Sequence, residues 1–109
     1  MSLLGIEEYR PSLDKLVVAL CLDFDERDRV LSAEELSRRV RMEYKYLNCR
    51  MLEAAEEIAG SSAALGYIRE IGKGVGYYHS RIENLSESTY KKEKSLIKIG
   101  IARKLHLID

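Results

Sequence analysis

The fold is decided by one periodic stretch, LSRRVRMEYKYLNCRMLEAAEEIAG (residues 36–60). Its apolar residues recur every three or four positions, which is the spacing of one face of an α-helix. They are Leu36, Val40, Tyr44, Leu47, Met51, Ala54 and Ile58. Ser32 with Glu35 three residues later predicts a capping box, and Gly60 is the residue that helix C-caps prefer. The stretch therefore predicts a helix over about residues 33–59, roughly 40 Å long at 1.5 Å per residue, in an elongated molecule.

The same stretch carries a second apolar stripe. Met42, Tyr46 and Cys49 follow one another at i, i+4 and i+7, on the side opposite Val40, Tyr44 and Leu47. One apolar face suffices for a surface helix, so two faces indicate a helix that is covered on both sides. Either this helix is the centre of the monomer, or one face meets another chain. We expect the second: a homo-oligomer, with a dimer favoured, that self-associates through Met42, Tyr46 and Cys49.

Three further helices are expected on either side of this stretch. Ser12 opens the first, which ends in the acidic stretch 23–28. Residues 62–84 carry two apolar columns through their glycines, so we predict one helix in which Gly72 and Gly76 admit a neighbouring backbone. The alternative is a break at residues 72–76, because glycine is a poor helix former. A last helix occupies residues 86–104.

No segment shows sustained period-two alternation, so the predicted fold is all-α. We expect a single domain, residues 1–109, forming an elongated four-helix antiparallel bundle with one long central helix.

Composition limits the classes of function. Apolar residues make up 46% of the chain, and 18 basic residues balance 18 acidic ones. The longest apolar run, residues 16–22, is far short of the ~20 residues that span a bilayer, so no membrane association is expected. Cys21 and Cys49 form no disulfide framework, which favours a reducing, cytoplasmic location.

Charge is unevenly distributed along the chain. Residues 1–60 carry a net charge of −4 and residues 61–109 carry +4. Either the two halves neutralise each other, within a monomer or across a dimer, or the basic C-terminal helix contacts phosphate.

No arrangement of residues predicts catalysis. The glycines of residues 72–76 do not match a phosphate-binding loop, because no strand precedes them and no Ser or Thr follows Lys73. The two histidines, His79 and His106, lack the spacing of metal ligands. We expect no catalytic residue, no metal and no cofactor, and hence not an enzyme. The sequence identifies no small-molecule substrate. A bundle that binds a small molecule or a lipid is a third alternative, although no polar cluster within the apolar columns marks a pocket.

The basic C-terminal segment allows two interpretations. By periodicity, Tyr90 lies on the buried face of the last helix with Ile97 and Ile101, and the lysines form its solvated side. The run Leu85-Ser86-Glu87-Ser88-Thr89-Tyr90-Lys91-Lys92-Glu93-Lys94, followed by Ile97, Ile101-Ala102 and Leu105, is also similar to the end of phage late-operon transcriptional regulators of the ArpU type. There a Ser-x-Ser-Thr-Tyr opening leads a basic helix that resembles the recognition helix of a helix-turn-helix.

The resemblance implies a DNA-binding regulator of phage or mobile-element type that uses residues 86–104. Its implied nucleic-acid contacts are Ser88, Thr89, Tyr90, Lys91, Lys92, Lys94 and Lys98. Self-association remains our first functional hypothesis, and DNA binding is the alternative.

Overall fold

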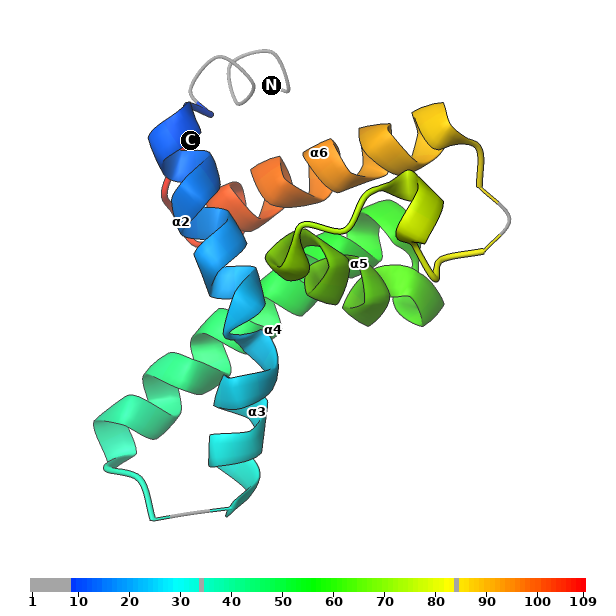
Figure 1. Cartoon of the computed structure of the whole chain (residues 1–109). Helices are drawn as coiled ribbons and strands as arrows, with labels where there is room; N and C mark the ends of the chain where they lie inside the picture. The colour runs from blue at the N-terminus through cyan, green and yellow to red at the C-terminus, as the bar shows by residue number, and fades with distance from the viewer. Residues whose placement is uncertain (1–8, 34, 84) are drawn as a thin grey trace.

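The computed structural model describes residues 9–33, 35–83 and 85–109, and within them the chain is helical with no strand (Figure 1). The elements, in chain order, are α2 (Pro11–Leu22), α3 (Phe24–Ala33), α4 (Arg38–Ala59), α5 (Ser61–Lys73), the short 3-10 helix η1 (Tyr77–His79) and α6 (Glu87–Lys104). Only Asp23 separates α2 from α3, so these described residues form four helical rods. The prediction of an all-α fold is confirmed.

The first rod begins earlier and extends further than predicted. α2 starts at Pro11 with Arg10 as N-cap, not at Ser12, because a proline in the first turn loses no helical hydrogen bond. The expected end of the first helix at the acidic stretch 23–28 is confirmed, since α2 ends at Leu22 with Asp23 as its C-cap, but the helix that follows was not expected. α3 begins at Phe24, and Asp25 and Glu26 lie in its first turn, where the helix dipole favours negative charge.

The long helix α4 begins later than predicted. Ser37 is its N-cap: the Ser37 hydroxyl accepts a hydrogen bond from the Val40 amide at 3.2 Å. The capping box at Ser32 is wrong, since Ser32 lies at the end of α3 and donates its hydroxyl to the Asp28 carbonyl at 3.2 Å. The predicted end at Gly60 is confirmed, with φ 84°. A helix over residues 38–59 is about 33 Å long.

The glycine-rich region is broken rather than continuously helical. α5 ends at Lys73, and Gly74 follows in the left-handed conformation with φ 70°, so the single helix over residues 62–84 is wrong and the alternative of a break is correct. The role expected of Gly72 is confirmed. A Cβ placed there would lie 2.6 Å from the Leu22 backbone nitrogen, so only glycine lets α5 approach α2 this closely. Gly76 has no such neighbour within 4 Å, and the same expectation for it is wrong.

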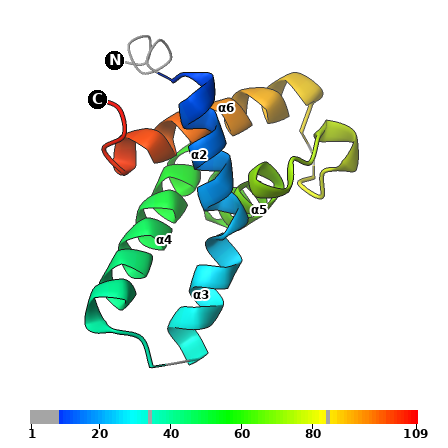
Figure 2. The ribbon, with the colours of Figure 1, turned by 60° about the vertical axis from the view of Figure 1, so that its left-hand side comes forward.

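The four rods are arranged as a body and an arm. In the body, α2, α5, α6 and the second half of α4 enclose the core, whose largest fully buried side chains are Val17, Met51, Tyr67, Ile68, Tyr90, Ile97 and Ile101. The arm consists of α3 and the first half of α4, which project away from the body (Figures 1 and 2). The molecule measures 43 × 30 × 22 Å, and its radius of gyration of 14.0 Å slightly exceeds the ~13 Å expected for a compact chain of this length.

Candidate functional site

Opposite sides of α4 have opposite environments. Asn48, Met51, Ala54 and Ala55 are buried. Because successive residues turn by about 100°, the residues that lie opposite Met51 recur along the whole helix. We call this surface the outward face of α4, and it consists of Arg38, Met42, Lys45, Tyr46, Cys49, Glu53 and Glu56.

The predicted self-association residues all lie on the outward face and are all accessible. Met42 is 62% exposed, Tyr46 is 45% exposed, and Cys49 is an exposed free thiol. The body contacts this stripe at Tyr46, whose hydroxyl donates to the Lys104 carbonyl at 3.3 Å. The Arg50 guanidinium also lies 5.9 Å from the centre of the Tyr46 ring. The end of α6 thus borders the stripe without covering Met42 or Cys49.

The direction of the arm is fixed by a buried arginine. Arg27 on α3 is 5% exposed, and burial lowers the pKa of its guanidinium. Its Nε donates to Asn48 Oδ1 at 2.7 Å, and Nη2 donates to the Leu20 carbonyl at 2.6 Å. The Asn48 amide in turn donates to the Phe24 carbonyl at 3.2 Å. This network ties α3 to the middle of α4 and so determines where the outer half of α4 projects.

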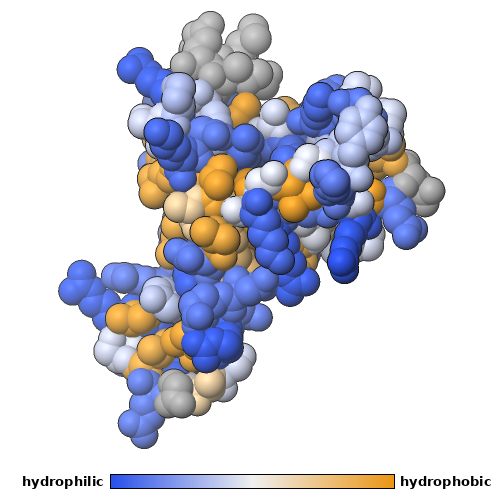
Figure 3. Space-filling model, in the orientation of Figure 1, coloured by the Kyte–Doolittle hydropathy of each residue, from blue (hydrophilic) through white to orange (hydrophobic). Residues whose placement is uncertain are grey.

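The arm buries its own apolar side chains incompletely. The residues between its helices are half-buried and lie outside the main core: Leu31, Leu36, Val40, Tyr44 and Leu47. Two helices alone cannot exclude water from a shared apolar face. In the space-filling view, apolar surface is visible on the lower lobe, which contains the arm, as well as on the body (Figure 3).

The residues that the phage-regulator resemblance implies are split between the surface and the core. Ser88, Thr89, Lys91 and Lys92 are exposed at the start of α6. Tyr90 is 1% exposed, and its hydroxyl donates to Glu70 Oε1 at 2.8 Å. Burial, reinforced by this hydrogen bond, raises the pKa of Tyr90 to about 12. Tyr90 is therefore part of the core, as the periodicity indicates, and not on a DNA-facing surface.

Several of the α6 lysines have partners within the chain. Lys94 donates to the Val75 carbonyl at 2.7 Å and lies 5.2 Å from the centre of the Tyr90 ring, and burial lowers its pKa. Lys98 pairs with Asp14 on α2 at 2.9 Å, and Lys91 pairs with Glu87 at 2.8 Å. Residues 74–86 separate α5 from α6, which is longer than the tight turn of a helix-turn-helix.

Glu70 holds the segment that precedes α6, a role that the sequence pattern did not reveal. Its carboxylate is buried and accepts hydrogen bonds from the Ser80 hydroxyl at 2.7 Å, the Tyr90 hydroxyl at 2.8 Å and the Arg81 amide at 2.8 Å. Satisfying three donors stabilises an otherwise irregular stretch. The only signal in the sequence is an acidic residue beside the apolar columns of α5.

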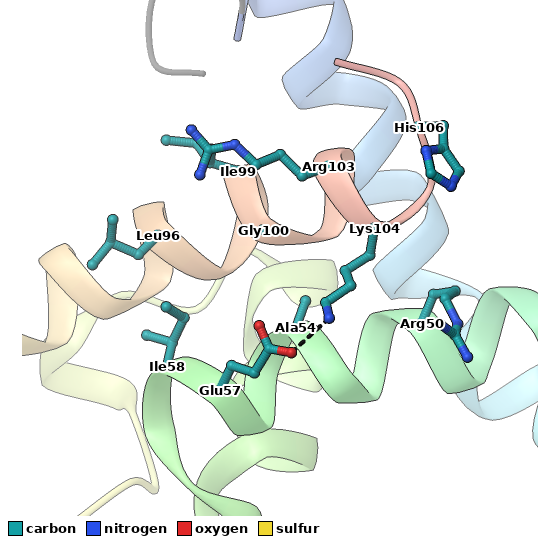
Figure 4. A pocket seen from close by; sticks show the side chains of 10 residues that line it. All are labelled: Arg50, Ala54, Glu57, Ile58, Leu96, Ile99, Gly100, Arg103, Lys104 and His106. Atoms are coloured by element: carbon teal, nitrogen blue, oxygen red, sulfur yellow. Dashed lines mark ion pairs between the residues drawn. The ribbon is translucent and has the colours of Figure 1, made fainter. Parts of the chain in front are cut away.

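A pocket of about 370 Å³ lies between α4 and α6 (Figure 4). Its floor includes Ala54 and Ile58, and Lys104 reaches from α6 to Glu57 on α4 with an N–O distance of 2.6 Å. Arg103 points away from α4 in this view. The ion pair joins the two helices, and the pocket presents no nucleophile with an adjacent base.

Across the part of the chain that the structure describes, no group of three or more His, Cys, Asp or Glu side chains is placed to hold a metal ion. Among the same residues, no helix has both the length and the apolar character needed to cross a bilayer. Comparison of the chain with protein-family models, with curated proteins and with solved structures finds no match.

Proposed function

We propose that this protein is a non-enzymatic helical module that self-associates through the outward face of α4. The observation that carries the proposal is the exposure of Met42, Tyr46 and Cys49 along one stripe of the long helix. A helix that places apolar side chains on two opposite sides needs something to cover each side. The body covers one side, and we assign the other to a second copy of the chain.

A second copy suits this surface because two-fold pairing joins a face to itself. Met42, Tyr46 and Cys49 are exposed, so this part of the face is accessible to a second copy. A helix about 33 Å long and 12 Å wide presents on the order of 400 Å² per copy. That is less than the ~800 Å² per partner of a standard stable interface, so we expect a transient dimer with a dissociation constant of about 100 μM.

The test is a charge placed in the middle of the outward face. Met42→Glu puts a carboxylate where the proposed dimer excludes water, and Glu forms helix about as well as Met, so the monomer stays folded. The matched control is Leu16→Glu, which changes a 45% exposed apolar residue on α2, away from this face. Light scattering at about 300 μM protein, three times the expected dissociation constant, measures the mass of each.

We expect the wild type and Leu16→Glu to share an average mass well above 12.5 kDa, and Met42→Glu to remain at the monomer mass. If Met42→Glu and the wild type have the same mass, the outward face is not the interface.

DNA binding is a second candidate, favoured by a different observation. Ser88, Thr89 and Lys92 are exposed in the first turns of α6, and helix N-termini attract phosphate groups. A duplex bound there would make its main charged contact through Lys92. Lys92→Glu should then lower the slope of log K against log salt by about one contact. A duplex that does not change the mobility of the wild type in low salt would refute this candidate.

A further inference from the structure

The outward face of α4 has an ordered charge pattern in addition to its apolar centre. Arg38 lies at its N-terminal end, and Glu53 and Glu56 lie toward its C-terminal end. The middle holds Met42, Tyr46 and Cys49, with Lys45 between Met42 and Tyr46. The face is thus basic at the tip of the arm, largely apolar with one lysine in the centre, and acidic beside the body.

This pattern opposes the dipole of the helix that carries it. The first turn of α4 contains Arg38 and Arg39 and no acidic residue. Glu56 and Glu57 lie near its end, and its last turn contains no basic residue. A helix dipole favours the reverse, with acids at the N-terminus and bases at the C-terminus. An isolated α4 is destabilised by this order, so the order calls for compensation from outside the helix.

The body supplies that compensation at one end only. Lys104 on α6 pairs with Glu57 at 2.6 Å and lies 3.9 Å from Glu53, which also pairs with Arg50 of α4 itself at 3.2 Å. Within the described residues, Arg38, Lys45 and Glu56 form no ion pair. The basic tip and the outermost acid of the outward face are therefore left for a partner.

We infer that two copies of the chain pair antiparallel through the outward faces of α4, with Tyr46 near the two-fold axis. Arg38 lies eight residues before Tyr46, and Glu53 and Glu56 lie seven and ten residues after it. At 1.5 Å per residue, Arg38 of one copy lies about 12 Å from the axis, between Glu53 at about 10.5 Å and Glu56 at about 15 Å on the other copy.

Antiparallel pairing brings the opposite charges at the two ends of the face together, although it also places Lys45 of both copies near the axis. The basic tip of each arm meets the acidic end of the other α4, Met42 of one copy approaches Cys49 of the other, and the two helix dipoles run in opposite directions. Parallel pairing would set Arg38 against Arg38 and Glu56 against Glu56, and both repel. Charge complementarity of this kind selects one orientation more strongly than it adds affinity.

The inference rests on the proposed function and is tested by exchanging charges between the two ends. Arg38→Glu makes both ends acidic, and Glu56→Lys makes the C-terminal end more basic. Each change agrees better with the helix dipole of α4, so neither unfolds the monomer. Urea denaturation of each variant, read by circular dichroism, checks this directly.

In an antiparallel dimer each reversal changes two symmetry-related contacts. Arg38→Glu alone and Glu56→Lys alone should each weaken self-association about tenfold in sedimentation equilibrium. An equimolar mixture of the two variants should form a mixed dimer with the affinity of the wild type, because both of its contacts are again complementary. Added salt should weaken the wild-type dimer.

A mixture that associates no more tightly than either variant alone overturns antiparallel pairing. An Arg38→Glu variant that dimerises like the wild type also overturns it. Parallel pairing predicts that result, because residue 38 of each copy would face residue 38 of the other, and the substitution would replace one repelling pair by another. A wild type that stays monomeric at every concentration instead overturns the proposed function itself, and the two failures are distinguishable.

Discussion

Replacement of Gly72 by alanine tests the packing of α5 against α2. A Cβ at residue 72 would lie 2.6 Å from the Leu22 nitrogen, 2.7 Å from the Leu22 Cα and 2.8 Å from the Cys21 carbonyl carbon. All three are backbone atoms, so no side chain can turn aside to make room, and the two helices must separate. Separation would open the core around Val17 and Ile68.

The change in unfolding free energy caused by Gly72→Ala is the difference between two opposing effects. Forcing an extra methyl group into a packed core costs about 1–3 kcal/mol and more where the obstacle is rigid. Alanine in place of glycine within a helix returns about 1 kcal/mol. We therefore expect Gly72→Ala to lose about 2 kcal/mol of unfolding free energy, which lowers Tm by about 8–16 °C in a domain of this size.

Gly66→Ala is the matched control in the same helix. Its new Cβ would meet only the Ile82 side chain, at 3.6 Å, which is ordinary van der Waals contact. The gain in helix propensity should then raise stability by up to about 1 kcal/mol. Urea denaturation of both variants gives the comparison. A Gly72→Ala protein as stable as Gly66→Ala would refute the close contact between α5 and α2.

Three further predictions concern single groups. Burial raises the pKa of Cys21 to about 12, whereas Cys49 is exposed. A thiol reagent at neutral pH should therefore modify only Cys49, and more slowly at protein concentrations that favour the dimer. Equal reaction of both thiols would contradict this. Burial alone would raise the pKa of Asp14, but hydrogen bonds from Lys98 and Tyr9 lower it. The ionised Asp14 therefore contributes to folding stability near neutral pH, and this contribution is lost as the pH falls through the pKa of the folded state. Lys98→Met should then lose less stability than the wild type between about pH 5 and 2. Glu70→Gln leaves one buried donor without an acceptor and should cost about 1–3 kcal/mol, with faster amide exchange in the loop before α6; unchanged exchange would show that the carboxylate does not hold this loop.

The parts of the fold that local sequence determines were predictable. Apolar spacing identified α4 from Val40 to Ile58, and Gly60 ends it because glycine readily adopts positive φ. The need for glycine at residue 72 followed from its position in an apolar column. The stripe formed by Met42, Tyr46 and Cys49 was also predictable, because helical periodicity alone places these residues opposite the buried face.

The errors have a common cause, which is contact between residues far apart in the chain. Ser32 and Ser37 are both good N-caps, and the choice depends on α3 continuing to Ala33, which the buried Arg27–Asn48 contact supports. The break after Lys73 is stabilised by Glu70, whose donors come from as far along the chain as Tyr90. Neither contact leaves a local signature in the sequence.

The charge pattern of α4 is not visible in the net charges of the two halves of the chain. Arg38, Lys45 and Glu56 become meaningful only when the structure shows which side of the helix is buried. The pattern then lies on the same face as the exposed apolar stripe. The proposed dimer and its antiparallel orientation therefore rest on one claim, that the outward face of α4 binds a second copy of the chain.

That claim is tested most directly by sedimentation equilibrium of the wild-type chain from about 1 to 500 μM, with and without a DNA duplex. The account predicts a monomer of 12.5 kDa at the lowest concentration, an average mass that rises toward twice that value, and no change when the duplex is added. A mass of 12.5 kDa at every concentration would contradict it.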